Sequence, residues 1–80
     1  MDSTRTVHDP FLDVVTTQVH KNDPPQARAA FRRLTALGLD RKEALQLISE
    51  ALRDEMDRML SESTPFDKGH YARLLDRLGG

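Results

Sequence analysis

The stretch that decides the fold is residues 22–51, with the sequence NDPPQARAAFRRLTALGLDRKEALQLISEA. Its apolar residues recur every three to four positions, which is the spacing of one face of an α-helix. Gly38 interrupts the pattern at a position where a glycine in the left-handed conformation can end a helix. Asp40 and Glu43 then match the capping-box pattern, with Asp in place of Ser or Thr. The stretch therefore predicts two amphipathic helices joined by a turn at Gly38.

Further helix signals lie on both sides of this hairpin. Asp9-Pro10 can begin a helix that runs to residue 20, because Asp caps free N–H groups and Pro fits the first turn. A short strand is the alternative for that segment, which is rich in β-branched residues. Asn22 or Asp23 can cap the first helix of the hairpin, which begins at the two prolines.

The second helix of the hairpin is unusually long. No proline or glycine interrupts it between residues 40 and 63, so it would extend roughly 33 Å at ~1.5 Å per residue. The segment SESTP, residues 61–65, ends it, and Asp67 can cap a last helix that turns residues such as Phe66, His70 and Tyr71 towards the core. We expect an all-α fold in which about four helices form a small bundle around the hairpin. Residues 8–80 form a single domain, and residues 1–7 are expected to be disordered.

Composition excludes several classes of protein. The chain has 80 residues, no cysteine and a net charge of −1, which rules out disulfides, thiolate zinc sites and an overall basic field for nucleic acid. There is no apolar core for a signal peptide and no run of the roughly 20 apolar residues that a membrane span needs. We therefore expect a cytoplasmic protein without a membrane partner.

Charge is unevenly distributed along the hairpin. Residues 24–42 hold five cations and one anion, a net +4, whereas residues 43–62 hold six acids and two arginines, a net −4. The simplest interpretation is complementarity between solvated helix faces. The functional interpretation is a surface for a charged partner or a second copy of the chain. In that case the residues predicted to bind the partner are the cations of the basic arm: Arg28, Arg32, Arg33, Arg41 and Lys42.

No pattern of catalytic or metal-binding residues is present. His8, His20 and His70 lie in different elements without the i,i+4 pairing that places two histidines on one helix face. No serine lies at a glycine-flanked elbow, and no glycine-rich loop follows a strand. His70 is expected to be a half-buried packing residue, and the carboxylates of the long helix are expected to form a solvated face. We predict no catalytic residue, no metal, no cofactor and no enzymatic activity.

Two functions remain. The preferred one is a non-catalytic helical interaction or regulatory protein that binds an unidentified protein or itself, because Met56, Met59 and Leu60 lie on the overhanging end of the long helix. The last helix could instead cover those residues. The less favoured alternative is a helix-turn-helix DNA-binding regulator that reads bases with Arg41, Lys42 and Gln46 in the first turn of that helix. The acidic body of the helix opposes it, because it would repel phosphates.

The hairpin and its surroundings also resemble a family of small, uncharacterised bacterial helical proteins, a domain of unknown function. The residues that match its pattern are His8-Asp9-Pro10, Gln18, Asn22-Asp23-Pro24-Pro25, Arg33-Leu34, Gly38, and Arg41 with Glu43-Ala44. The resemblance covers residues 7–60 and implies an all-helical domain without an established activity. Relatives often have histidines where this chain has Lys42 and Gln46, so a metal role that such a pair could have does not carry over here.

Overall fold

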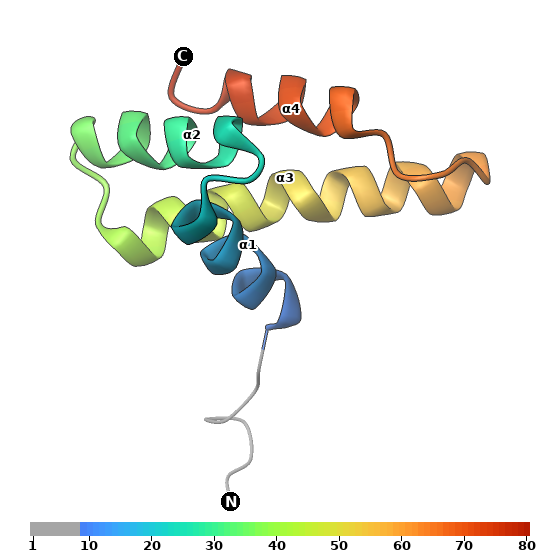
Figure 1. Ribbon diagram of the computed structural model, residues 1–80, viewed down its shortest axis with the longest axis horizontal. Coiled ribbons are helices and arrows are strands. Elements are labelled where there is room, and N and C mark those ends of the chain that lie inside the picture. The colour runs from blue at the N-terminus through green and yellow to red at the C-terminus, as the bar shows by residue number, and fades with distance from the viewer. Residues whose placement is uncertain (1–8) are drawn as a thin grey trace, which may run out of the picture.

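The computed structural model describes residues 9–80, so the expectation of disorder for residues 1–7 lies outside the described residues, as does His8. The described chain forms four α-helices: α1 (Pro10–Lys21), α2 (Pro25–Ala36), α3 (Arg41–Glu62) and α4 (Lys68–Arg77) (Figure 1). Every regular element between residues 9 and 80 is a helix. The predicted all-α class is therefore confirmed, and helix rather than strand is correct for α1.

The hairpin of α2 and α3 is the centre of the bundle. In Figure 1, α3 runs back along α2 in the opposite direction, while α1 crosses in front of α3 and α4 lies along the top. Helices α1 and α4 each pack against both α2 and α3, but they do not pack against each other. This is the arrangement expected from the sequence, and it leaves a space between α1 and α4.

Side-chain caps begin three of the four helices as predicted. Asp9 accepts hydrogen bonds from the backbone N–H groups of Phe11 and Leu12. Asp40 and Glu43 form a reciprocal capping box, in which each side chain accepts from the other residue's backbone N–H, at 2.8 and 3.0 Å. Asp67 accepts from the N–H of His70. Each cap satisfies donors that have no partner within the helix.

Gly38 closes α2 in the predicted way. Its φ of 104° lies in the region that glycine adopts without a steric penalty. The N–H of Gly38 donates to the carbonyl of Thr35, and the N–H of Leu39 donates to the carbonyl of Leu34. This pair of bonds is the Schellman motif, and it turns the chain directly into α3.

The connection between α1 and α2 differs from the prediction. Asn22 adopts a left-handed conformation with φ of 57° and ends α1 instead of capping α2. The N-cap of α2 is Pro24, which follows a cis peptide bond and offers no capping side chain. The expectation that Asn22 or Asp23 caps α2 is therefore wrong. Asparagine tolerates the left-handed region, so it serves as the stop of the helix before it.

The core is built from small residues on α2 and larger ones on α3 and α4. Ala27 and Ala30 of α2 are fully buried, as are Ala44 and Ile48 of α3, and such small side chains allow the two backbones to approach closely. The buried apolar residues of the described chain are Val15, Ala27, Ala30, Leu34, Ala44, Leu45, Ile48, Ala51, Leu52, Tyr71 and Leu75.

Helix α3 is much longer than the helices that pack against it. It has 22 residues and α2 has 12, about 33 Å against about 18 Å. Its last turns protrude beyond α1 and α2 (Figure 1). None of the helices within residues 9–80 combines the length and the apolar character required to cross a membrane.

Candidate functional site

The most unusual polar group of the described chain is the carboxylate of Glu55, which is completely buried. Arg58 donates to it through Nε and Nη2, at 3.0 and 2.6 Å from Oε1 and Oε2. The backbone N–H of Asp67 donates to Oε2 at 2.9 Å, and Nδ1 of His70 lies 2.5 Å from Oε1. Glu55 thus joins α3 to the first turn of α4 and to the segment that precedes it.

These contacts keep Glu55 ionised. The hydrogen-bonded Arg58 guanidinium lowers the pKa of Glu55 from 4.5 to about 2, against the opposing effect of burial, with further help from Asp67 N–H and His70. The same pairing raises the pKa of Arg58. A carboxylate with so low a pKa does not exchange a proton readily near neutral pH. Near neutral pH Glu55 is therefore an ionised carboxylate, neutralised by Arg58, at the junction of α3 and α4.

Arg58 extends this cluster to the loop between the two helices. Its Nη1 donates to Glu62 and to the hydroxyl of Thr64, each at 3.0 Å, and its Nη2 reaches the carbonyl of Pro65. Glu55 and Glu62 form ion pairs with Arg58, and this cluster fixes residues 63–67 against α3.

The expectation that the carboxylates of α3 form a solvated face is therefore wrong for Glu55. A signal was present in the sequence, since Ile48, Leu52, Glu55 and Met59 follow the 3–4 residue spacing of the buried stripe. His70 is half-buried as predicted, with 34% of its side chain exposed, but it is a hydrogen-bond partner of Glu55 rather than a packing residue. Its role could not be inferred without knowing that Glu55 turns inward.

A carboxylate on Nδ1 of a histidine also orients the ring in many catalytic and metal sites. Between residues 9 and 80, however, no hydroxyl group is hydrogen-bonded to His70. No group of three or more His, Asp or Glu side chains in that range could hold a metal ion. His20 is exposed at the end of α1. The contact of His70 with Glu55 joins α4 to α3.

The five cations predicted to bind a partner fall into two groups. Arg28, Arg32 and Arg33 line one open hollow of about 380 Å³ beside Asn22. Arg41 and Lys42 line another, with Leu12 and Leu45. The structure therefore does not bring all five to one surface.

Two of these cations have structural partners. Arg28 donates to the carbonyls of Val19 and His20 at the end of α1, at 3.0 and 2.6 Å. Arg33 donates to the carbonyls of Leu75 and Leu78 at the end of α4, at 2.8 and 2.9 Å. Both arginines thus cap the carboxyl end of a neighbouring helix.

The other three are more available. The guanidinium of Arg41 lies over the ring of Phe31, 5.7 Å from its centroid. The side chains of Arg32 and Lys42 are exposed and form no hydrogen bond or ion pair within residues 9–80. No ion pair in that range joins the arginines of α2 to the carboxylates of α3. Backbone carbonyls are instead the partners of Arg28 and Arg33, and complementarity between the solvated faces of the two arms stays a prediction.

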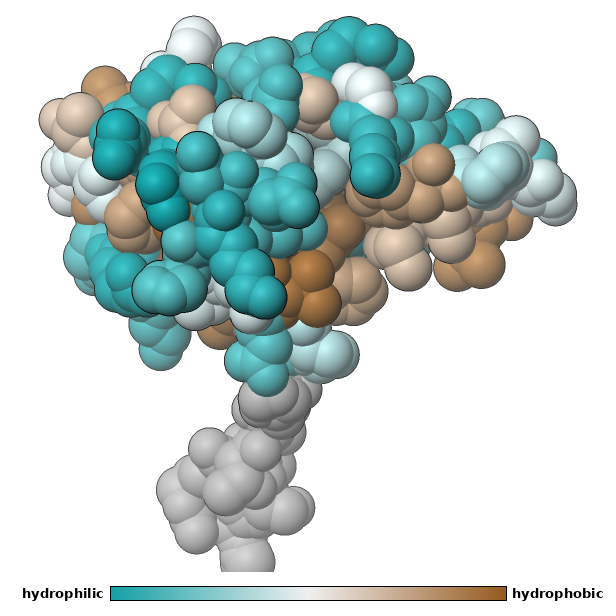
Figure 2. All heavy atoms as spheres, in the orientation of Figure 1, coloured by the Kyte–Doolittle hydropathy of each residue, from teal (hydrophilic) through white to brown (hydrophobic). Residues whose placement is uncertain are grey.

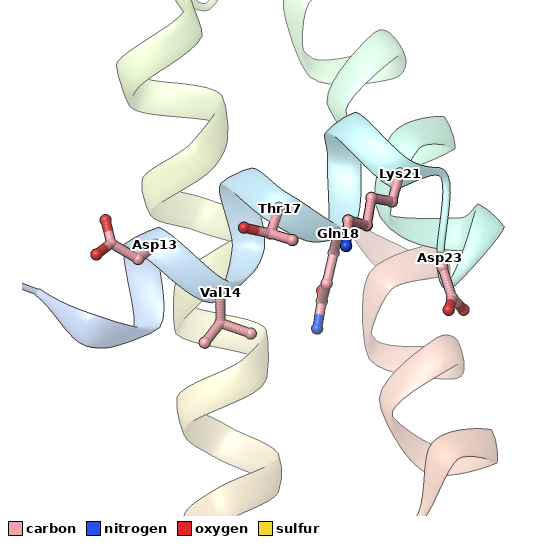
Figure 3. Close-up of a pocket in the computed structure, with 6 residues that line it drawn as sticks. All are labelled: Asp13, Val14, Thr17, Gln18, Lys21 and Asp23. Atoms are coloured by element: carbon pink, nitrogen blue, oxygen red, sulfur yellow. The ribbon is translucent and has the colours of Figure 1, made fainter.

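A groove follows the outer side of α1 towards α4. One hollow of about 380 Å³ is lined by Asp13, Val14, Thr17, Gln18, Lys21 and Asp23. A second, of about 220 Å³, is lined by Gln18, Asp23, Pro24, Phe66, Lys68 and Tyr71. The two hollows share Gln18 and Asp23 and so adjoin each other, and we call them together the α1–α4 groove. Gln18 points from α1 towards the space between α3 and α4 (Figure 3).

A hydrogen bond joins the two sides of this groove. The hydroxyl of Tyr71 donates to Oε1 of Gln18 at 2.7 Å and so connects α4 to α1. Burial raises the pKa of Tyr71 to about 12. Phe66 meets the Tyr71 ring edge to face, with centroids 5.6 Å apart.

Apolar side chains are gathered on the protruding end of α3 and near α1 (Figure 2). Met56 and Met59 are partly buried there, whereas Leu60 is 74% exposed. Phe66, expected to face the core, is 38% exposed, because it lies in the extended segment before α4. We call Met56, Met59, Leu60 and Phe66 the overhang surface. Of the two readings of these residues, coverage by α4 holds only in part, since Leu60 stays open to solvent.

Comparison of the chain with models of known families, with curated proteins and with solved structures finds no match.

Proposed function

We propose that this protein is a non-catalytic helical interaction module that holds an apolar helical segment of a protein partner against the α1–α4 groove and the overhang surface. One observation carries the proposal. Leu60, Val14 and Phe66 are large apolar residues with 74%, 47% and 38% of their surface exposed, and they lie on the groove or on the protruding helix. Exposed apolar side chains that gather on one region mark interaction sites on small soluble domains, and Figure 2 shows such a gathering on the protruding end of α3.

The chemistry of the surface suits a helical ligand. Methionine side chains adapt to irregular partners, and Met56 and Met59 supply them on the protruding end of α3. A groove between helices accepts the anchors that an amphipathic helix presents at i, i+3 and i+4. Phe66 and Tyr71 add an aromatic pair at one end of the groove.

The interior of the bundle supports a non-catalytic role. The carboxylate of Glu55 has all its donors supplied by Arg58, Asp67 and His70. A group held ionised in this way strengthens the fold instead of moving protons near neutral pH.

The proposal is tested by affinity capture of a partner with the full chain and two matched variants. Leu60→Glu puts a charge on the overhang surface, and Leu37→Glu does the same at an equally open position, 64% exposed, at the turn between α2 and α3. We expect a partner, or a second copy of the chain, to be retained by the wild type and by Leu37→Glu and lost with Leu60→Glu. Equal retention by both variants would show that the overhang surface is not the contact.

The basic arm supplies further contacts in this proposal, at two separate places, for acidic parts of the partner. Arg32 and Lys42 are the residues to change first, because their side chains have no structural partner within residues 9–80. Charge reversal of these two should weaken binding and leave the far-UV circular dichroism unchanged. Arg28 and Arg33 are unsuitable for that test, since each caps a helix.

DNA binding is the alternative. Lys42 and Gln46 are exposed in the first turns of α3, as a DNA-reading helix would require, but Glu43 and Glu50 are exposed there too. In addition, α3 runs back along α2 (Figure 1), whereas the two helices of a helix-turn-helix motif cross at about 90–120°. A gel shift with random duplex DNA at low salt separates the two functions. A shift at tens of micromolar protein, abolished by Lys42→Glu, would favour DNA binding.

We also propose that the protein is cytoplasmic and that it is related to the small bacterial helical proteins that its sequence resembles.

A further inference from the structure

We infer that the hollow on the exposed face of α2 binds a phosphate group carried as a monoester. This hollow has a volume of about 380 Å³, and we call it the arginine hollow. The inference goes beyond the proposed function, because it names the chemistry of one ligand and does not depend on the overhang surface. The residues that line the arginine hollow are Asn22, Pro25, Arg28, Ala29, Arg32 and Arg33.

The arginine hollow holds three cations and no acid. The two hollows of the α1–α4 groove and the hollow at the start of α3 each include at least one aspartate in their lining. No ion pair within residues 9–80 involves Arg28, Arg32 or Arg33. The nearest acid along the chain, Asp23, lines the α1–α4 groove instead. The charge of the arginine hollow is therefore not neutralised by a carboxylate of the described chain.

Two of these arginines are held in place and keep their charge. Arg28 and Arg33 donate through Nε and Nη2 to carbonyls at the carboxyl ends of α1 and α4. Their Nη1 groups form no hydrogen bond within residues 9–80, so both still have donors for a ligand. A carbonyl is neutral, and the two helix ends together contribute only about one negative charge. Against three guanidinium groups, this leaves a net charge of about +2.

Arg32 is the cation that is free to close on a ligand. Its side chain is exposed and forms no hydrogen bond or ion pair within residues 9–80. Arg28 precedes it by four residues on the same helix, and like charges at that spacing repel each other. An anion bound in the arginine hollow would relieve this repulsion.

A phosphate monoester fits this hollow better than other anions do. It carries about 1.5 to 2 negative charges at pH 7, which match the net charge of the hollow, whereas a carboxylate carries one. Guanidinium groups donate paired hydrogen bonds to phosphate oxygens, and the fixed side chains of Arg28 and Arg33 lose little freedom in doing so. A nucleic acid strand needs a track of cations, but Arg41 and Lys42 line a separate hollow.

Titration of the full chain with inorganic phosphate, followed by nuclear magnetic resonance, gives the first test. We expect saturable shifts of backbone amide signals in residues 22–33 and at the helix ends that Arg28 and Arg33 contact, with a dissociation constant on the order of a millimolar. Acetate at the same ionic strength should bind roughly tenfold more weakly, because it carries less charge. Shifts that do not saturate, or that acetate reproduces equally, would overturn the inference.

Matched variants locate the site. Arg32→Ala removes the free guanidinium, and the loss of a charge-assisted hydrogen bond should weaken phosphate binding by roughly tenfold or more. Arg32→Lys keeps the charge and should recover part of that loss. Lys42→Ala removes another exposed cation, from the separate hollow, and should bind phosphate like the wild type. Equal weakening by Arg32→Ala and Lys42→Ala would show only general attraction to surface cations and would refute the site.

The source of the phosphate is decided by comparing free O-phosphoserine with a short peptide that contains phosphoserine. Equal affinities would identify a small phosphorylated molecule as the ligand, and a much tighter peptide would identify a phosphorylated side chain of a partner. Either result supports phosphate binding, and binding of neither would contradict it. The capture experiment with Leu60→Glu does not involve Arg32, so failure of the proposed function and failure of this inference are separate results.

Discussion

Glu55 shows how one residue can depart from the pattern in which it lies. Its position on the buried stripe of α3 brings a carboxylate into an apolar environment, which is costly unless donors surround it. Three neighbours meet that need: Arg58 from the next turn, the N–H of Asp67, and His70 from α4. The cost of burial is thus offset only when α3, α4 and the loop between them are all in place.

Replacing Glu55 by Gln should therefore destabilise the protein strongly. The substitution keeps the shape but removes the buried one of the two carboxylates that pair with Arg58. Because Glu62 still pairs with Arg58, we expect a loss at or below about 3–5 kcal/mol, which is the cost of breaking a fully buried pair. Urea denaturation measures the loss. Asp54→Asn, at the exposed neighbouring position, is the control and should change stability little; similar midpoints for both variants would contradict the structural role of Glu55.

Acid should act on the same residue. Because Arg58 and the other donors lower the pKa of Glu55 from 4.5 to about 2, its contribution is complete above about pH 4.5. As the pH falls from there towards 2, the unfolded chain takes up a proton that the folded chain resists, so stability declines. The thermal midpoint of the wild type should fall across this window. Glu55→Gln should show a shallower dependence on pH; identical slopes would show that Glu55 does not drive the decline.

Tyr71 should make the stability of the fold depend on alkaline pH. Burial raises its pKa from 10.0 to about 12, so between those values the unfolded chain ionises while the folded chain does not. Stability should therefore fall as the pH rises from 10 towards 12. Since Tyr71 is the only tyrosine of the chain, tyrosinate absorbance follows it directly. A transition near pH 10 in the folded protein would show that its ring is open to solvent.

At the scale of the elements, α2 organises the ends of its neighbours. Arg28 and Arg33 leave this one helix and reach the last carbonyls of α1 and of α4 respectively. Carbonyls at a helix end lack partners within the helix and carry a partial negative charge, so a guanidinium there satisfies both needs. Two separate helices are thereby tied to α2 without any ion pair to a carboxylate.

Removing either arginine should loosen the bundle. Arg28→Ala and Arg33→Ala each lose two hydrogen bonds from a charged donor, a class in which each bond contributes about 1.5–3 kcal/mol. Because both sites are partly open to water, we expect each variant to lose unfolding free energy near the lower end of that range. Arg32→Ala, on the same helix and exposed, is the matched control and should lie within about 0.5 kcal/mol of wild type. Chemical denaturation of the three variants side by side is the measurement.

At the scale of the whole molecule, the bundle is unequal in length. Helices α1, α2 and α4 have 10 to 12 residues, whereas α3 has 22. The loop of residues 63–67 folds back along α3 through Arg58 and covers part of the protruding end. Leu60 nevertheless remains open, so the monomer does not bury all the apolar surface of its longest helix.

Stability should consequently depend on protein concentration. If association buries the overhang surface in the folded state only, mass action stabilises the fold and raises the thermal midpoint as concentration increases. Calorimetry of the wild type over a hundredfold range of concentration should show this rise. Leu60→Glu should have a constant midpoint, and a constant midpoint for the wild type as well would argue against self-association.

The sequence alone determined the elements, because their signals are local. Caps at Asp9, Asp40 and Asp67 and the stop at Gly38 involve hydrogen bonds within a few residues, which residue type and spacing suffice to predict. The apolar stripes likewise fixed which faces pack together. Only the tertiary structure decided which groups the charged side chains contact. Arg28 contacts a helix end instead of a carboxylate, and Glu55 contacts His70 instead of water. The groups that decide these contacts lie 8 to 15 residues away along the chain. A side chain's partner is set by which surfaces the fold brings together, and that information is not local.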